Sequence, residues 1–218
     1  MQPKRRRHLC RRFSLTHSLD GHQAHFLQRR PRYRASVSLH ADLVHRCSKE
    51  FPKFLTYEYY DISPRGYVPV LEFDNGAWHS EVSALLQHVA DHDPEQALIG
   101  RVGSERRLAV TEAPSYVGTK VRKVFSPWLW HKETADSTHA VVRERLAARF
   151  AELDRLFARQ DFVAGAYSVA DSYAFAVLNW VNFLSIPIAA FPSLGAYLNR
   201  ASSRPAVQAA LRAEGLVR

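Results

Sequence analysis

The stretch YVPVLEFDNGAWHSEVSALLQHV, residues 67–89, predicts two strands followed by a helix. Residues 67–73 form an apolar strand that contains Pro69, and residues 74–76 (DNG) are a strong turn signal that returns the chain as a second strand. Ser80 can cap the helix that follows. The apolar residues of this helix share one face at helical spacing: Val82, Leu85, Leu86 and Val89. We therefore expect an antiparallel hairpin that leads directly into an amphipathic helix.

Residues 104–218 carry helical patterns throughout, whereas residues 92–103 carry none. Acidic residues, Pro94 and two glycines make residues 92–103 the best candidate for a boundary between domains. We therefore expect an N-terminal domain over residues 1–91, a linker over residues 92–103 and an all-α domain over residues 104–218.

Several signals define helices in the C-terminal part. Ser168 and Asp171 have the spacing of a capping box, with Asp in place of the usual Glu. Pro192 and Pro205 suit first helical turns, and Gly215 suits a helix stop. A long amphipathic helix is predicted by apolar residues that step by three or four: Val142, Leu146, Phe150, Leu153 and Phe157. The helix after the capping box carries a similar set: Tyr173, Val177, Trp180 and Leu184.

The positive charge of the chain lies in its first residues. The formal net charge is +9, and residues 1–34 contain ten Lys and Arg against one acidic residue. The remaining residues hold 20 basic and 20 acidic side chains. Because this charge belongs to a tail without interleaved aromatic residues, we do not expect a nucleic-acid partner. The Arg-rich start also resembles a mitochondrial transit peptide, although its amphipathic period is poor.

Cys10 and Cys47 are the two cysteines of the chain. They form neither a disulfide framework nor a metal-ligand spacing, which fits a reducing compartment. No apolar stretch reaches the roughly 18 residues of a membrane span. We therefore expect a cytoplasmic protein with no bound metal and no membrane partner.

Four segments taken in order resemble the bacterial beta-class glutathione transferases: SPRGYVPVLEFDNG at 63–76, SEVSALLQHVAD at 80–91, YSVADSYAFAVLNW at 167–180 and RPAVQAALRAEGL at 204–216. The similarity covers residues 57–218, about three quarters of the chain. It implies an α/β plus all-α fold, in which a thioredoxin-like N-terminal domain precedes an all-helical C-terminal domain. Residues 1–54 are Arg-rich and atypical of this family.

The resemblance implies a glutathione site on the hairpin and the helix after it. In this family the residue before a cis proline offers its backbone to the cysteinyl part of glutathione, and Val68 and Pro69 take these positions. Glu81 and Val82 fall where the γ-glutamyl end binds, although Val82 lacks the hydroxyl of the family's usual serine. Alternatively, Pro69 merely blocks an edge strand and Glu81 is a favourable first-turn acid.

Arg122 and Lys123 take the positions of a family histidine and lysine that face the thiol. A guanidinium cannot act as a base, but it can stabilise a thiolate. The alternative is that Arg122 is a solvated surface charge. Ser115 stands where an asparagine usually reaches across the dimer, and Ser115 and Thr119 are expected to contact glutathione.

These site residues belong to an expected helix over residues 104–125 that crosses the mouth of the site. Pro114 is expected to break that helix. Four aromatic residues nearby could line an apolar pocket for an electrophile, but aromatic residues at helical spacing belong more often to a core: Phe125, Trp128, Trp130 and Trp180.

The family cysteine that lies near the glutathione sulfur has no equivalent at the expected position. Counting back from Pro69 without gaps, Phe26 stands at that position, and Phe51 replaces a lysine that helps to hold glutathione. Cys10 and Cys47 lie at the wrong distances. Two explanations remain open: a reading-frame shift upstream of about residue 54, or true divergence of the N-terminal unit.

The resemblance implies a homodimeric glutathione S-transferase with a role in detoxification. The protein would conjugate the thiolate of glutathione, its co-substrate, to small hydrophobic electrophiles, or reduce disulfides or peroxides. Because the family cysteine and histidine are replaced, a second reading is a glutathione-transferase-fold binding protein that has lost its catalytic N-terminal residues.

Overall fold

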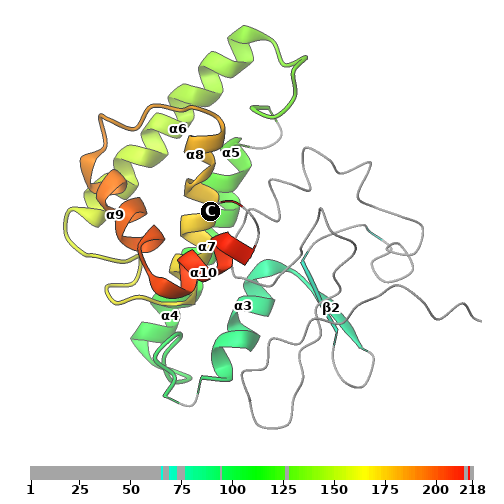
Figure 1. Ribbon diagram of the computed structural model, residues 1–218, viewed down its shortest axis with the longest axis vertical. Coiled ribbons are helices and arrows are strands. Elements are labelled where there is room, and N and C mark those ends of the chain that lie inside the picture. The colour runs from blue at the N-terminus through cyan, green and yellow to red at the C-terminus, as the bar shows by residue number, and fades with distance from the viewer. Residues whose placement is uncertain are drawn as a thin grey trace, which may run out of the picture.

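The computed structural model describes residues 65, 69–72, 77–93, 95–125, 128–213 and 216. Figure 1 shows a short hairpin followed by helices only. The elements, in chain order, are β1 (Val70–Glu72), β2 (Trp78–Ser80), α3 (Val82–Asp91), α4 (Glu105–Tyr116), the π-helix η1 (Val117–Arg122), α5 (Lys123–Phe125), α6 (Asp136–Phe157), α7 (Val169–Leu178), α8 (Trp180–Phe183), α9 (Pro192–Ser202) and α10 (Pro205–Ala213).

β1 and β2 form the expected antiparallel hairpin. Val70 lies opposite Ser80, and Glu72 lies opposite Trp78. The prediction that Ser80 caps the next helix is wrong, because Ser80 is the last residue of β2 and Glu81 occupies the N-cap position. Pairing with Val70 holds Ser80 in the sheet and therefore overrides its capping preference.

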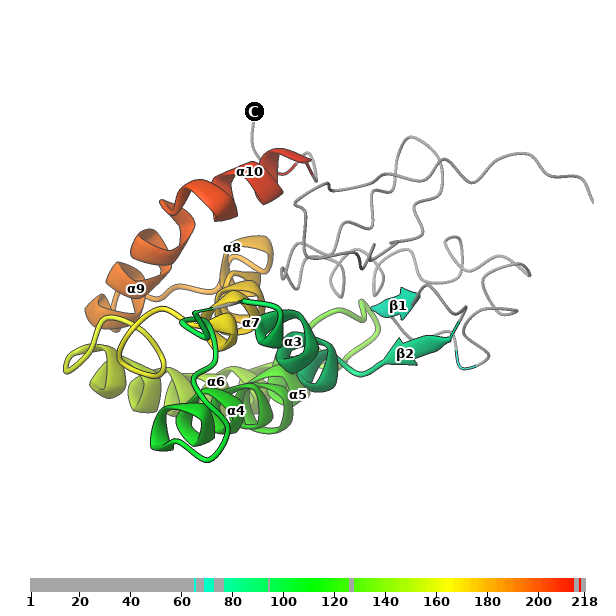
Figure 2. The same ribbon diagram turned by 90° about the horizontal axis from the view of Figure 1, so that it is seen from below.

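The helices after α3 surround α7, whose ten residues are all buried. Figure 2 shows α7 at the centre of the bundle, with the hairpin and α3 to one side. The long helix α6 buries the five residues predicted from its apolar stripe: Val142, Leu146, Phe150, Leu153 and Phe157. Pro192 and Pro205 begin α9 and α10, as predicted. Gly215 lies outside the described residues.

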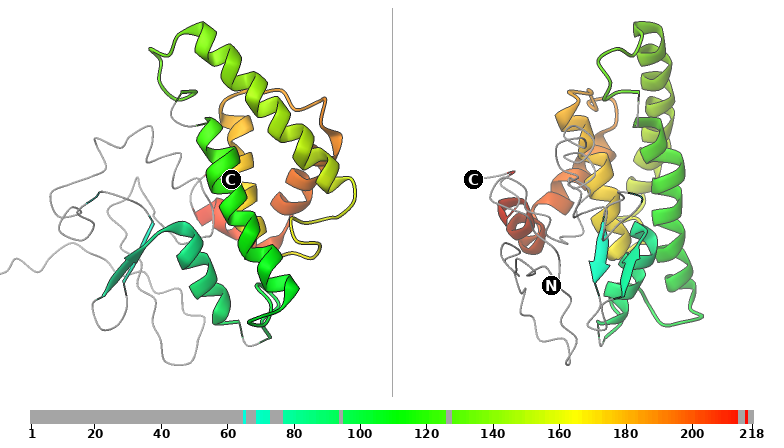
Figure 3. Two further views of the ribbon diagram at one scale, coloured as in Figure 1. Left: turned by 180° about the vertical axis from the view of Figure 1, so that it is seen from behind. Right: turned by 90° about the vertical axis from the view of Figure 1, so that its right-hand side faces the viewer.

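α4, η1 and α5 form one continuous rod, which Figure 3 shows in full. The prediction that Pro114 breaks this helix is wrong, because Pro114 lies buried inside α4 and the chain continues helically to Phe125. A proline in a helix removes one backbone hydrogen bond and crowds the preceding turn. The turn before Pro114 stays α-helical, and the π-helix η1 begins three residues after the proline.

A buried capping box opens α7, as predicted from Ser168 and Asp171. The Asp171 carboxylate accepts hydrogen bonds from the Ser168 amide at 2.9 Å, the Ser168 hydroxyl at 3.0 Å and the Val163 amide at 2.8 Å. Burial raises the pKa of Asp171, although these hydrogen bonds oppose the rise. The motif ties the loop before α7 to the start of the central helix.

Candidate functional site

A single residue, Glu81, joins β2 to α3. Its backbone has φ 76° and ψ 110°, and a positive φ is unusual for a residue with a side chain. Such a conformation costs about 1–3 kcal/mol and persists only where the surrounding structure fixes it. The strained turn between β2 and α3 is therefore a candidate functional feature.

The N-terminus of α3 is a candidate anion-binding site. Among the described residues no side chain caps this helix, and its first turn contains no acidic residue. The Glu81 carbonyl accepts hydrogen bonds from the amides of Ala84 and Leu85 at 3.1 and 3.0 Å. The amides of Val82 and Ser83 come before these and have no acceptor within the helix. Together with the helix dipole, these two amides attract negative charge.

Pro69 lies at the same end of the hairpin as this helix start. Val70 and Ser80 form the last pair of the antiparallel ladder, so their chain neighbours Pro69 and Glu81 lie at the same end of the hairpin. Val68, the predicted backbone partner of glutathione, lies outside the described residues. The structure thus brings together Pro69, Glu81 and Val82.

Arg122 ends η1, and its side chain is half-buried. η1 packs against α7, where a Cβ atom added to Gly118 would lie 3.4 Å from the Tyr173 hydroxyl oxygen. Burial raises the pKa of Tyr173, and the positive charge of Arg122 partly offsets this rise. Arg122 and the Tyr173 phenol are therefore electrostatic neighbours.

Ser115 and Thr119 lie on an exposed face of the rod. Their hydroxyls bond to backbone carbonyls one turn earlier: Ser115 to Thr111 at 3.4 Å, and Thr119 to Ser115 at 2.7 Å. Lys123 is also exposed. These side chains lie on the same rod as Arg122, but they are exposed whereas Arg122 is half-buried.

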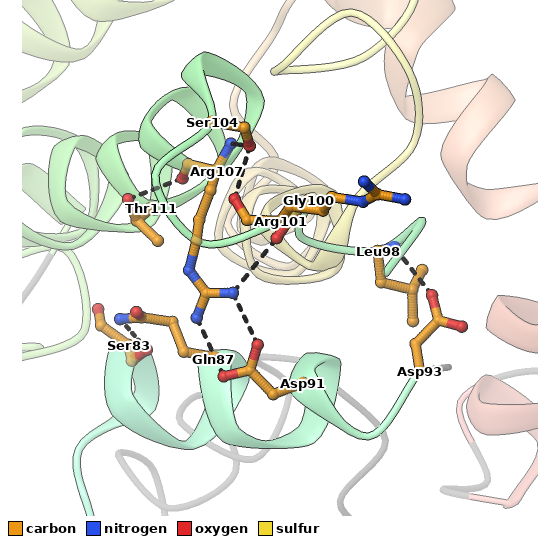
Figure 4. Close-up of polar contacts among 10 residues, drawn as sticks. All are labelled: Ser83, Gln87, Asp91, Asp93, Leu98, Gly100, Arg101, Ser104, Arg107 and Thr111. Atoms are coloured by element: carbon orange, nitrogen blue, oxygen red, sulfur yellow. Dashed lines mark hydrogen bonds and ion pairs between the residues drawn. The ribbon is translucent and has the colours of Figure 1, made fainter. Parts of the chain in front are cut away.

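An ion pair fastens α3 to the helical part of the chain. Figure 4 shows the Arg107 guanidinium of α4 reaching Asp91 at the end of α3, with two N···O distances of 2.7 and 3.0 Å. Arg107 also donates to the Gly100 carbonyl at 3.3 Å. The hydrogen bond from Arg107 lowers the pKa of Asp91. This contact fixes where α3, and so its N-terminus, lies relative to the rod.

Comparison with known proteins identifies the family. Residues 119–205 match the family model for the glutathione S-transferase C-terminal domain. The glutathione S-transferase GstA of Escherichia coli O157:H7 is 31% identical over 160 residues, which cover 73% of this chain and 79% of the relative. The chain belongs to the glutathione S-transferase family.

Solved glutathione S-transferase structures have the same fold. A sphingomonad enzyme complexed with glutathione is 38% identical, with a TM-score of 0.68, and the match covers 73% of this chain and 79% of that one. The bacterial beta-class enzyme of Sphingomonas chungbukensis is 35% identical, with a TM-score of 0.68 and the same coverage. The predicted resemblance to bacterial glutathione S-transferases and the predicted fold class are therefore confirmed.

The four aromatic residues of the predicted pocket divide into two groups in this glutathione S-transferase. Phe125 and Trp180 are core residues, with 0% and 1% exposure, and their rings meet edge to face at 5.5 Å. Trp130 meets Trp180 in the same way at 5.5 Å, whereas Trp128 is half exposed. The prediction that these aromatic residues belong to a core is therefore confirmed for Phe125 and Trp180, and Trp130 is partly buried and packs against the same core.

The site residues of this glutathione S-transferase are only partly evident from sequence. Phe26, Phe51 and both cysteines lie outside the described residues. Within the described ranges, no three or more His, Cys, Asp or Glu side chains gather in a way that could hold a metal ion. The same ranges contain no helix with the length and apolar character to cross a membrane. The sequence predicts Tyr173 only as part of a helix, because its contact with Gly118 joins distant segments.

Proposed function

We propose that this chain binds glutathione at the turn between β2 and α3 and transfers its thiolate to a small hydrophobic electrophile. The observation that supports this most directly is the convergence of Pro69, the strained Glu81 and the uncapped start of α3 at one end of the hairpin. The first turn of α3 offers backbone amides to an anion, and the exposed Glu81 offers a carboxylate to a cation. An α-amino acid group carries both charges, and the γ-glutamyl end of glutathione is such a group.

Each charge of the γ-glutamyl group has a partner in this arrangement. The amides of Val82 and Ser83 would bind the carboxylate, and the exposed Glu81 side chain would pair with the ammonium group. Val82 supplies an amide but no hydroxyl, so we expect weaker affinity than a serine would give. Val68 and Pro69 would contact the cysteinyl residue of the ligand.

The thiolate would be stabilised by Arg122. A guanidinium is a cation that lowers the pKa of a nearby thiol but does not act as a base. The half-buried position of Arg122 strengthens this effect relative to a fully solvated cation. The proton of the thiol would leave to solvent, and attack on the electrophile would follow.

A second copy of the chain would complete the assembly as a cytoplasmic homodimer. Ser115 and Thr119 face outward on the rod, and Leu108 of the same helix is 68% exposed. In such a dimer Ser115 and Thr119 would approach glutathione bound to the partner.

A binding protein without chemistry is the second candidate. The replacements that favour it are Arg122 at the family histidine position and Phe26 at the cysteine position. Such a protein would retain glutathione affinity through Glu81 and α3 but would show no conjugation. Reduction of disulfides or peroxides by bound glutathione is a further possible activity of the same site.

Conjugation kinetics separate these functions. We would measure the glutathione-dependent rate with an aryl halide from about pH 6 to about pH 9, a range that spans the ordinary change in thiol ionisation. We expect a weak rate that falls in Arg122→Ala and is unchanged in Cys10→Ser and in the control Arg143→Ala on the exposed side of α6. Binding with no rate at any pH would favour the non-catalytic protein. A rate lost in Cys10→Ser would overturn the role of Arg122.

A further inference from the structure

Two histidines lie one helical turn apart at the C-terminal end of α3. His88 belongs to the last turn of the helix, and His92 is its C-cap residue, whose backbone remains in the helical region. Residues four apart on a helix are neighbours on one face, so the two imidazoles project from the same side of α3. This pair lies at the opposite end of α3 from the proposed glutathione site.

The two imidazoles approach each other through their Nε2 atoms. These atoms are 3.3 Å apart, and the rings meet edge to face with their centroids 4.8 Å apart. Zinc binds histidine nitrogens at about 2.0–2.1 Å in tetrahedral sites, so two nitrogens on one zinc ion are separated by about 3.3–3.4 Å. Coordination at right angles, as in a square-planar copper site, requires a shorter separation of roughly 2.9 Å. The observed separation therefore matches a tetrahedral ion.

The end of α3 favours a cation at this position. The last carbonyl groups of a helix carry partial negative charge, and His88 and His92 lie at this end. Figure 4 shows the Asp91 carboxylate turned toward Arg107, which holds its two oxygens at 2.7 and 3.0 Å. Asp91 is therefore not a third ligand. Its charge and that of Arg107 oppose each other, which leaves the carbonyl end of the helix as the field that attracts a metal ion.

The other nearby carboxylate is also engaged. The two oxygens of Asp93 accept hydrogen bonds from the Glu95 and Leu98 amides at 3.3 and 3.1 Å. No group of three or more His, Cys, Asp or Glu side chains suited to a metal forms among the residues that the structure describes. The site thus has two protein ligands in that part of the chain. Both histidines are half-buried rather than sealed, so water can fill the remaining positions on the ion.

We propose that His88 and His92 chelate a zinc ion through their Nε2 atoms, with water at the other two positions. The ring that carries hydrogen on Nε2 would change to its Nδ1–H tautomer, so that both Nε2 lone pairs bind the metal. The second ring nitrogen of a metal ligand commonly donates a hydrogen bond, so contacts of the Nδ1 atoms are compatible with chelation. The spacing of the cysteines predicts no metal, whereas the spacing of these two histidines provides for one.

The test is calorimetric titration of zinc chloride into the full chain near neutral pH, with wild type, His88→Gln and His92→Gln. The control is His131→Gln, because His131 is an exposed histidine between α5 and α6. Each of the first two variants should bind this zinc at least about tenfold more weakly, since loss of a group that only orients a metal ligand already costs 10–100-fold. The control should match the wild type.

Hydrogen exchange shows where the ion binds, which matters because the chain has 11 histidines. At the end of α3 the His92 amide donates to the Val89 carbonyl at 3.3 Å, and the Asp93 amide donates to the Ala90 carbonyl at 3.2 Å. Zinc should slow exchange of these amides in the wild type and the control but not in the His88 and His92 variants. The effect should weaken as the pH falls, because protons and zinc compete for the same nitrogens.

Equal zinc affinity in all four proteins, or unchanged exchange at the end of α3 in the presence of zinc, would overturn the proposal. The two histidines would then form a hydrogen-bonded pair only. Unfolding midpoints without zinc show whether each variant is folded, and His92→Gln, at the cap rather than within the helix, decides the result if His88→Gln does not fold. Glutathione is omitted because its thiol also binds zinc, so the outcome does not depend on the proposed function.

Discussion

The capping box of α7 gives a quantitative prediction about the stability of the helical domain. Asp171 is fully buried and accepts three hydrogen bonds of 2.8–3.0 Å, two of them from backbone amides. Asp171→Ala leaves these three donors without an acceptor, at about 1–3 kcal/mol each. Removal of a desolvated carboxylate offsets part of this cost. We therefore expect a net loss of about 3–5 kcal/mol of unfolding free energy.

Ser168→Ala should lower the free energy of unfolding much less than Asp171→Ala. The Asp171 carboxylate still accepts hydrogen bonds from the Val163 and Ser168 amides, so only the hydroxyl contact and its capping role are lost. Such a substitution costs about 1 kcal/mol. The loss of unfolding free energy in Asp171→Ala should therefore be at least twice the loss in Ser168→Ala.

Urea unfolding followed by circular dichroism measures both losses. Asp136→Ala is a matched control, because Asp136 is also an acidic first-turn residue but is exposed at the start of α6, where no side chain caps the helix. This control should change stability by no more than about 0.5 kcal/mol. A loss in Asp171→Ala equal to or smaller than that in Ser168→Ala would show that the buried carboxylate does not hold the loop and helix together.

Two further predictions concern contacts between elements. Arg107→Ala should lower the unfolding midpoint more than Arg143→Ala does near neutral pH, because it breaks the bond to Asp91. Since the Asp91 pKa is lowered from 3.8 in the folded state, this contribution is present above that value and disappears in thermal unfolding scans as the pH falls through the folded pKa. Tyr116→Phe should cost about 1 kcal/mol in urea unfolding, and in the wild type the Tyr116 phenol should titrate at a pKa of about 12, because burial and the contact with Glu152 favour its neutral form. A Tyr116 phenol that titrates near 10 would contradict that contact.

The helical half of the fold is predictable because its signals are local. The five apolar residues of α6 repeat at helical spacing, and all five are buried. Ser168 and Asp171 lie three residues apart, so the capping box can be recognised before any tertiary contact is known. In both cases the residues that cooperate are neighbours in the chain.

The sequence predictions that are wrong concern residues at which a tertiary contact outweighs a local preference. Ser80 has a strong capping preference, but it pairs with Val70 in the hairpin and so moves the N-cap to Glu81. Pro114 disfavours a helix, but it lies buried in the packed rod, and α4 continues through it. The energy of these tertiary contacts cannot be inferred from the local sequence pattern.

The candidate site also has one part that could be predicted from the sequence and one part that could not. The start of α3 could be located to within one residue from residues 67–89 alone, because hairpin and helix follow each other directly in sequence. The neighbourhood of Arg122 could not, because it depends on Gly118 and Tyr173, which meet across two packed helices. The assignments of Val68, Glu81 and Arg122 to glutathione remain predictions.

A glutathione site at the start of α3 is tested by isothermal titration of glutathione into three proteins: the wild type, Glu81→Gln and the control Glu105→Gln. Glu105 is an exposed acidic residue in the first turn of α4. We expect one glutathione bound per chain in the wild type and the control. Because Glu81 is exposed, its charge-assisted contact should contribute near the lower end of about 1.5–3 kcal/mol, so Glu81→Gln should weaken binding roughly tenfold. No heat of binding at millimolar glutathione, or equal affinity in all three proteins, would contradict a glutathione site at the start of α3.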